Sequence, residues 1–224
     1  MRWPCRRSSD HGLKTLARAR ARGVVVGAHP GFADREGFGR RLIPLTTTEI
    51  EQLVATQVEA LLGAAALAAT RIRYVKPHGA LGNWAADDRP MADTIVRATK
   101  TISPGLAILA ISGTELEIIG REAGLAVFSE VFADRGYLAN GRLVPRKRGR
   151  SLDSRFRFAA RRLIEFLSTG LMPTIEGASI APEAHSICVH GDSDGALAMA
   201  RHVRIELEAA GILVEPFLAS SSSS

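Results

Sequence analysis

The chain has 224 residues, of which 46% are hydrophobic and 23% are charged. This length and composition suit one globular domain with a substantial core and exclude a disordered chain. The formal net charge is +6, but aromatic residues make up only 5% and no nucleic-acid-binding motif accompanies the basic residues. Nucleic acid is therefore excluded as the expected partner.

Arginines concentrate at 2–22 and at 142–162, with a dense basic cluster at 146–150. We interpret them as solvated faces or as sites for an anionic small ligand. No stretch approaches the roughly 18 apolar residues of a membrane span, and the N-terminus lacks the apolar segment of a secretory signal. The two cysteines, Cys5 and Cys188, are too few for a disulfide framework. We expect a cytoplasmic protein with no membrane partner.

In chain order, apolar residues recur at helical spacing in six segments. The predicted helices are 13–22, 46–69, 90–101, 112–124, 152–169 and 192–210. Short aliphatic or β-branched runs lie between them. The predicted strands are 24–28, 72–75, 106–111, 126–130, 186–189 and 212–216. Residues 78–88 are predicted as a loop, 172–185 as loop or short strand, and Asn140-Gly141 as a tight turn.

Several polar residues have the spacing of helix caps. Glu51 follows Thr48 by three residues, and Glu115 follows Ser112 by three, which is the spacing of a capping box. Asp88 is predicted to cap the helix that starts near Pro90, and Asp192 or Asp194 the last helix.

Strands that alternate with amphipathic helices predict an α/β protein with a parallel sheet, either closed as a barrel or open. We expect a single domain at 13–218, a disordered arm at 1–12 and a disordered serine tail at 219–224. The sequence contains neither the GxxxxGK[ST] loop nor a strand followed by GxGxxG, so a common nucleotide cradle is absent.

Three predicted strands end in a histidine with a glycine close behind. They carry His29-Pro30-Gly31, Lys76-Pro77-His78-Gly79 and His190-Gly191-Asp192. The carboxyl ends of parallel strands are where α/β proteins place their active sites, because the strand fixes the position and the loop supplies the chemistry. The long loop after His29 holds three glycines and is expected to be functional.

Side chains of this kind predict proton transfer next to an anionic group. His29, His78 and His190 are candidates for a general base or acid. Other candidates fall into two sets: cations for phosphate or carboxylate (Lys76, Arg40, Arg41), and acids that orient a histidine or bind a metal (Asp34, Asp134, Asp192). The alternative interpretation is structural, with hydrogen-bonded strand-end histidines and with Asp34 and Asp192 as turn or helix caps. We interpret His11, His185 and His202 as incidental.

Four segments resemble the LamB/YcsF family, in the family's order. They are GAHPGFADREGFGRR (27–41), VKPHGALGN (75–83), EVFADRGYLANGRLVPR (130–146) and ICVHGD (187–192). The resemblance spans nearly the whole chain and implies a (β/α) barrel of about seven strands, similar to polysaccharide deacetylases. The matched motifs add Asn83 and Arg135 to the substrate-binding candidates.

The family's best-known members are A subunits of bacterial 5-oxoprolinase. The resemblance thus implies opening of the lactam 5-oxoproline to L-glutamate, driven by ATP hydrolysis and dependent on subunits B and C. The alternatives are a stand-alone metal-dependent amidase or deacetylase, with His29 and His78 as ligands of a divalent metal, and a truncated remnant without catalysis.

The chain departs from the family pattern at its start. Family members open with an Asp-Leu-Asn-x-Asp-x-Gly-Glu-like strand and an Ala-Cys-Gly-Phe-His-Ala-Gly-Asp-like motif, and neither is found here. We therefore expect a barrel that lacks its first strand, in an N-terminally truncated chain. Two further positions differ from the family pattern: Gly82 stands where the family has a tyrosine, and Gly149-Arg150-Ser151 stands where it has Pro-Gly-Ala.

Overall fold

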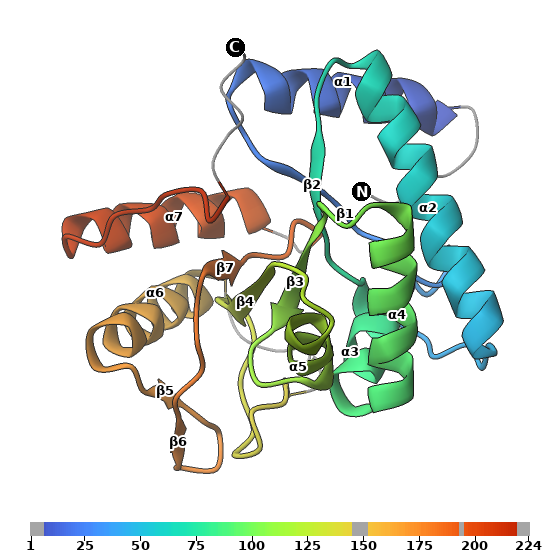
Figure 1. The fold of residues 1–224 in the computed structure, drawn as a ribbon. Coiled ribbons are helices and arrows are strands. Elements are labelled where there is room, and N and C mark those ends of the chain that lie inside the picture. Colours follow the sequence, from blue (N-terminus) through green and yellow to red (C-terminus); the bar gives the residue numbers. More distant parts are fainter. Residues whose placement is uncertain (1–6, 145–151, 193–194, 219–224) are drawn as a thin grey trace. The chain divides into compact units, whose positions relative to one another are not determined.

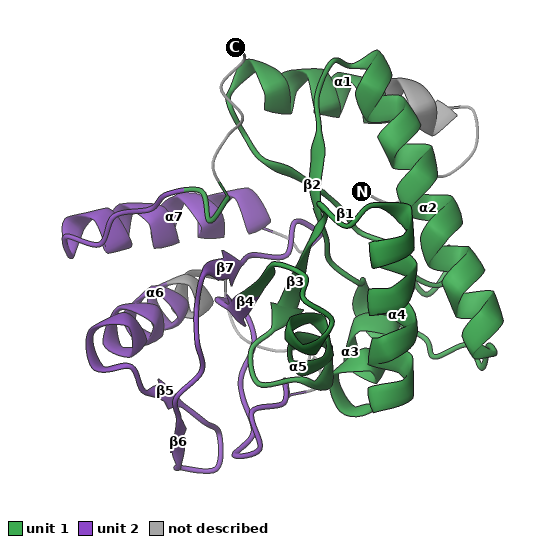
Figure 2. Ribbon diagram, viewed as in Figure 1, with its two compact units in different colours: residues 1–128, 216–224 green, residues 129–215 purple. Residues whose placement is uncertain are grey.

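The computed structural model describes residues 7–144, 152–192 and 195–218 and divides into two compact units (Figures 1 and 2). Unit 1 comprises residues 1–128 and 216–224, and unit 2 comprises residues 129–215. Several predicted features lie outside the described residues: the first half of the N-terminal arm with Cys5, the basic cluster at 146–150 with Gly149-Arg150-Ser151, Asp194 and the serine tail.

Unit 1 is built from parallel strands joined by helices. Its elements are α1 (Arg7–Ala21), β1 (Val26–Ala28), α2 (Thr47–Leu67), β2 (Ile72–Val75), α3 (Gly79–Asp87), α4 (Arg89–Ile102), β3 (Ala107–Ile111), α5 (Glu115–Glu122) and the first two residues of β4 (Val127–Phe132). Strand β1 pairs with β2, and β2 with β3, all in parallel. The α/β class with a parallel sheet is confirmed.

The core of unit 1 lies between this sheet and helices α2 and α4, which run side by side (Figure 1). Helix α2 buries one stripe at helical spacing, with Ile50, Val54, Val58 and Leu61 all at most 2% exposed. By length and composition alone α2 is long and apolar enough to cross a membrane, contrary to our expectation that no segment qualifies. Its buried stripe shows that it serves as a core helix.

Unit 2 holds the rest of β4, α6 (Leu152–Thr169), β5 (Met172–Pro173), β6 (Ser179–Ile180), β7 (Ser186–Cys188) and α7 (Ala196–Ala209). Strand β4 pairs in parallel with β7, so that Phe132 lies opposite Cys188. Strands β5 and β6 form a short antiparallel hairpin. Helices α6 and α7 pack on each other, and their apolar sides form the core with Val131 and Tyr137.

The structure corrects several predicted boundaries. Helix α1 starts at Arg7, and 78–88 is not a loop but contains α3. The capping box of α2 joins Thr46 to Glu49 rather than Thr48 to Glu51. The predicted box of Ser112 with Glu115 does not form, because the N-cap is Thr114.

Other predicted features of the turns and caps are confirmed. Asp88 caps α4 through a 2.8 Å hydrogen bond from the Met91 amide. The turn at Asn140-Gly141 is present, with Gly141 at a φ of +80° and the Arg142 amide donating to Asn140 Oδ1. One predicted cap is wrong: helix α7 has Gly195 as its N-cap, so Asp192 does not cap it.

The predicted strand at 212–216 is absent from the described residues after α7. The chain instead returns to unit 1, where the Phe217 ring lies 5.3 Å from that of Tyr74 and 4.9 Å from that of Phe128. An aromatic contact takes the place of backbone pairing here.

Alanine substitutions at two glycines, one in β1 and one in α2, test the packing of these elements. Gly27 lies opposite Tyr74, and a Cβ at position 27 would come within 2.1 Å of the Tyr74 ring, whereas a Cβ at Gly63 on α2 would meet nothing within 4 Å. We expect Gly27→Ala to lower the free energy of unfolding by about 1–3 kcal/mol through overpacking. Its control, Gly63→Ala, should raise it by about 0.5–1 kcal/mol, because alanine favours the helix. Urea unfolding measures both, and a Gly27→Ala chain as stable as the parent contradicts the register of β1 and β2.

Candidate active site

Two strand-end histidines meet in unit 1. His29 follows β1 and His78 follows β2, and because the strands are parallel neighbours both rings reach the same edge of the sheet. His29 Nε2 lies 2.9 Å from His78 Nδ1, with the ring centroids 4.7 Å apart and the planes at 79°. The structure thus brings together two of the three strand-end histidines, while His190 lies in unit 2.

The hydrogen bonds of this pair determine how many protons it holds. The Lys76 carbonyl oxygen lies 2.6 Å from His29 Nδ1, and the Phe38 carbonyl oxygen lies 2.6 Å from His78 Nε2. Carbonyls only accept, so both of these outer nitrogens carry hydrogen. The contact between the two inner nitrogens needs a third hydrogen, because two lone pairs repel each other. Three protons on four ring nitrogens give the pair one positive charge.

The environment of His29 indicates which ring is charged. Burial, followed by the positive charges of Lys76 and His78, lowers the pKa of His29 from 6.5 to about 3. His29 is therefore the neutral partner near pH 7. With its hydrogen on Nδ1, His29 accepts at Nε2 from His78 Nδ1.

Two residues that sequence reasoning missed hold the pair in place. The side-chain amide of Gln57 on α2 accepts from the Gly31 amide at 3.2 Å and donates to the Gly31 carbonyl at 2.7 Å, which fixes the His29-Pro30-Gly31 turn. Phe38 has a φ of +56°, which is uncommon for a residue with a side chain, and directs its carbonyl to His78. In the sequence, the only sign of these two residues is the polar Gln57, which follows the buried Ile50 of α2 by seven residues.

The loop between His29 and α2 is closed by Asp34 and Arg41. Asp34 accepts from the Gly37 amide at 2.9 Å and from Arg41 Nε at 3.1 Å, and Arg41 Nη2 makes a further contact with it. The hydrogen bond from Arg41 holds the pKa of Asp34 well below its ordinary value. These contacts give Asp34 and Arg41 a role in loop structure, and their predicted roles with substrate stay predictions.

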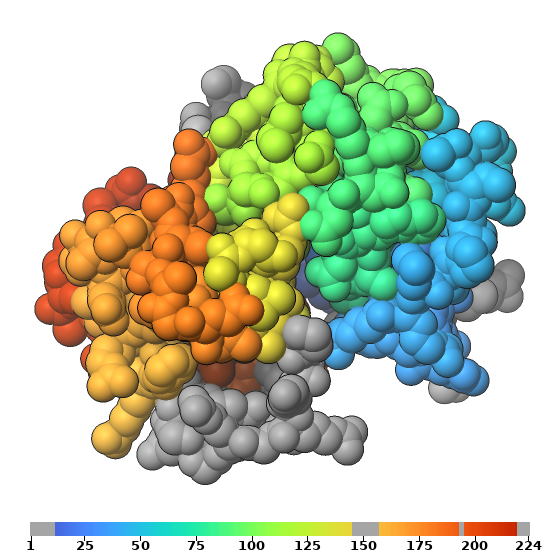
Figure 3. All heavy atoms as spheres, turned by 90° about the horizontal axis from the view of Figure 1, so that it is seen from below, coloured from blue at the N-terminus to red at the C-terminus, as the bar shows by residue number. Residues whose placement is uncertain are grey.

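The loop also rests on the start of α3. The Ala80 amide donates to the Gly39 carbonyl at 3.0 Å. Gly79, at a φ of +56°, has no room for a Cβ because the Gly39 carbonyl oxygen would lie 2.5 Å from it. In Figure 3, blue atoms from this part of the chain lie against green atoms of unit 1.

The other candidates of unit 1 lie around the pair. Lys76 is half-buried, and its positive charge acts on His29. Arg40 is exposed, with its guanidinium 5.2 Å from the centroid of the Phe38 ring. Asn83 is exposed on α3. Two cationic side chains thus accompany the charged histidine pair.

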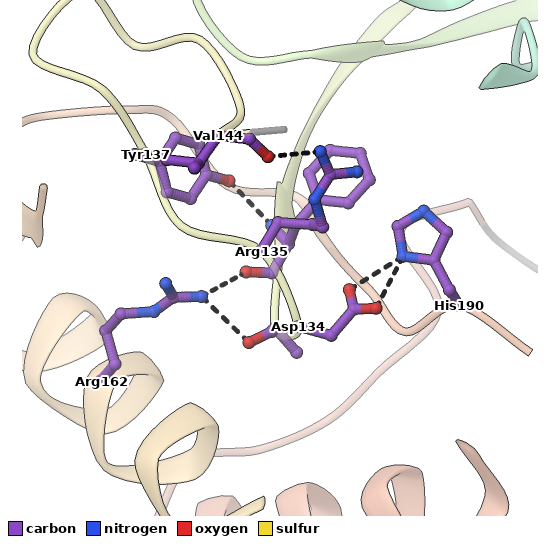
Figure 4. A network of polar contacts seen from close by, with 8 residues as sticks. Asp134, Arg135, Tyr137, Val144, Arg162 and His190 are labelled. Atoms are coloured by element: carbon purple, nitrogen blue, oxygen red, sulfur yellow. Dashed lines mark hydrogen bonds and ion pairs between the residues drawn. The ribbon is translucent and has the colours of Figure 1, made fainter. Parts of the chain in front are cut away.

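A pair formed by an imidazole and a carboxylate lies in unit 2 (Figure 4). His190, two residues after β7, directs Nδ1 to both carboxylate oxygens of Asp134, at 2.8 and 2.9 Å. The Phe132 ring stacks on the imidazole, with centroids 5.5 Å apart. A carboxylate only accepts, so Nδ1 carries hydrogen, and in the neutral ring Nε2 is the basic nitrogen. The predicted role of Asp134 as a residue that orients a histidine agrees with this geometry.

The remaining candidates of unit 2 are Arg135 and Asp192. Arg135 turns away and donates to the Val144 carbonyl at 2.6 Å, and Asp192 is exposed (Figure 4 shows Arg135). His185, which we interpreted as incidental, accepts from the Ser129 amide at 3.0 Å and so ties the start of β7 to β4.

The residues present do not favour a metal site. Among the residues that the structure describes, no three of His, Cys, Asp or Glu gather as possible ligands of a metal ion. All four ring nitrogens of His29 and His78 already take part in hydrogen bonds. We therefore derive no step through a divalent metal.

Imidazoles held at the carboxyl ends of parallel strands define an α/β protein with a candidate acid–base site at the sheet edge. Comparison with known proteins narrows this class. The model of the LamB/YcsF family matches residues 10–222, and the chain belongs to this family. It is 45% identical to the A subunit of 5-oxoprolinase from Gluconobacter oxydans (strain 621H), over 90% of the chain and 79% of that protein.

Two further relatives support the same assignment. The A subunit of 5-oxoprolinase from Azorhizobium caulinodans is also 45% identical, over 91% of this chain and 81% of that protein. The crystal structure of the lactam utilization protein from Thermus thermophilus has a TM-score of 0.82 and 38% identity, and covers 93% of this chain and 83% of that chain. The predicted family and fold class are confirmed.

The lowered pKa of His29 makes stability depend on pH. An unfolded histidine binds a proton below pH 6.5 that folded His29 binds only near pH 3, so acidification favours the unfolded chain. Between pH 7 and 5 we expect the parent chain to lose about 2 kcal/mol of unfolding free energy through this residue. The His29→Gln variant should lack this part of the loss, as measured by denaturant unfolding at both pH values. Equal losses in the two chains would contradict a neutral, buried His29.

Proposed function

We propose that this chain is an A-type subunit of a 5-oxoprolinase, which opens 5-oxoproline to L-glutamate with hydrolysis of ATP. The observation that carries the proposal is the 45% identity, over 90% of the chain, to a protein named as the A subunit of 5-oxoprolinase. The similar lactam utilization protein supports a cyclic amide as the substrate class.

The chemistry of a lactam explains why such a site needs acid–base groups. A five-membered lactam is a resonance-stabilised amide, so its carbonyl must be activated, a water deprotonated and the leaving nitrogen protonated. Transfer of the ATP γ-phosphoryl group to the lactam oxygen supplies the activation. Water then attacks the carbonyl carbon, and the C–N bond breaks as the nitrogen is protonated, which leaves an acyl phosphate. A second water hydrolyses the acyl phosphate, so that 5-oxoproline, ATP and two waters give glutamate, ADP and inorganic phosphate.

The two histidine sites, each within one unit, offer different chemistry for such a reaction. In the Asp134–His190 pair, Nδ1–H faces the carboxylate, so the neutral ring offers Nε2 as a general base for water. The ring nitrogens of His29 and His78 are engaged with each other and with backbone carbonyls, so this charged pair suits electrostatic stabilisation of an anionic group beside it. The cations of Lys76 and Arg40 suit a phosphate or carboxylate group.

Other parts of the proposal follow from the names of the relatives. A protein named as one lettered component of an enzyme works within an assembly, and we propose subunits B and C as its partners and ATP as the co-substrate. We also propose that the enzyme acts in the cytoplasm. Arg41 and Asp34 shape the loop beside the pair in this scheme.

The test uses the full chain with 5-oxoprolinase subunits B and C and measures glutamate formed from 5-oxoproline, with and without ATP. We expect ATP-dependent glutamate formation that falls by about 10²- to 10⁴-fold in Asp134→Asn, because the amide no longer holds His190 in its productive tautomer. His202→Gln, on the partly exposed side of α7, serves as the matched control and should keep the parent rate.

A reference protein makes the negative result informative. If the A subunit from Gluconobacter forms glutamate with the same B and C subunits and this chain does not, the proposed activity is wrong. If this chain is active but Asp134→Asn retains the parent rate, the assignment of the base to His190 is wrong, and the corresponding His29→Gln and His78→Gln variants then test the other pair.

A further inference from the structure

Arg162 is a buried cation next to the Asp134–His190 pair, and no sequence motif pointed to it. It lies on α6, is 6% exposed, and extends toward the carboxyl end of β4 (Figure 4). Its neighbour Arg161 is exposed. A charged side chain is costly to bury, so its contacts indicate what it stabilises.

One nitrogen of Arg162 holds two consecutive carbonyls. Nη2 donates to the Phe132 oxygen at 2.7 Å and to the Ala133 oxygen at 2.9 Å. The Phe132 amide in turn donates to the Tyr137 hydroxyl at 2.8 Å. Side chains therefore bind the backbone of Phe132 on both its amide and its carbonyl side, just where β4 ends.

These hydrogen bonds hold the backbone that carries both residues in contact with the His190 imidazole. The Phe132 ring stacks on the face of His190, and Asp134, two residues further on, binds its edge through Nδ1. A rotation of the peptide planes at 132 and 133 would move the ring and the carboxylate together. A displacement of about 1 Å at a reacting group can lower the rate by about a hundredfold. The position of this backbone should therefore affect the reaction rate through the position of His190.

The charges around the Arg162 guanidinium are consistent with its holding the end of β4. Burial lowers the pKa of Arg162, while the negative charge of Asp134 acts in the opposite direction. Burial also raises the pKa of Tyr137 to about 12, so its hydroxyl stays neutral and able to accept from the Phe132 amide. The Arg162 guanidinium lies 5.9 Å from the Tyr137 ring centroid and 5.8 Å from that of Phe158.

We propose that Arg162 is a positioning residue, which fixes the end of β4 so that Asp134 holds His190 with its proton on Nδ1. This inference rests on the proposed function only for its effect on rate. The geometry of His190 can be measured without any substrate, so the two proposals can fail separately.

The experiment observes the ring nitrogens of His190 by NMR in the full chain labelled with ¹⁵N-histidine, with the signal assigned by its loss in His190→Gln. In the parent we expect one fixed tautomer, with hydrogen on Nδ1. In Arg162→Met we expect averaging between the two tautomers. The matched control Arg161→Met, on the exposed side of α6, should keep the parent spectrum, and Arg162→Lys should restore the fixed tautomer because a single nitrogen makes both carbonyl contacts.

Arg162→Gln provides the same readout if Arg162→Met does not fold, because glutamine remains polar but is too short to reach both carbonyls. A folded variant without arginine or lysine at position 162 that retains the fixed Nδ1–H tautomer overturns the proposal. In the glutamate assay we expect a fall in kcat of about 10- to 100-fold with KM within about twofold. A rise in KM at unchanged kcat would also overturn it.

Discussion

The hydrogen bond between His29 and His78 depends on the pairing of β1 with β2. Parallel pairing of Ala28 with Val75 brings the two strand ends level, and each histidine then follows its strand by one to three residues. A slip of one residue would turn one ring to the other face of the sheet. The backbone ladder therefore determines the chemistry, because it sets two imidazoles 2.9 Å apart and requires one proton between them.

The same principle recurs in unit 2 with different groups. There the pairing of Phe132 with Cys188 brings Asp134 and His190 together, and a carboxylate replaces the second imidazole. The two pairs differ in charge, since one holds a net positive charge and the other pairs a ring with a negative group. In the His29–His78 pair, backbone carbonyls complete the hydrogen bonds of the two rings.

Much of this arrangement is predictable from the sequence, because short aliphatic runs that end in His, Pro and Gly indicate strand ends. The sequence did not reveal Gln57, Phe38 or Arg162, since each acts through backbone groups that leave no pattern in side-chain identity. Helix α3 was missed because its two glycines suggest a loop, although the Ala80 and Leu81 side chains bury against the core. The Ser112 box failed because the Gly113 amide donates to Glu117 instead.

Phe38 carries a consequence for the order of its loop. A left-handed backbone costs a residue with a Cβ about 1–2 kcal/mol, and glycine at this position would avoid that cost. The carbonyl of Phe38 is held by the ring of His78, and its own ring meets that imidazole edge-on at 5.4 Å. The imidazole therefore acts on the backbone as well as on its partner ring: its contacts offset the cost of the left-handed conformation at Phe38, and without the ring that residue has less reason to keep it.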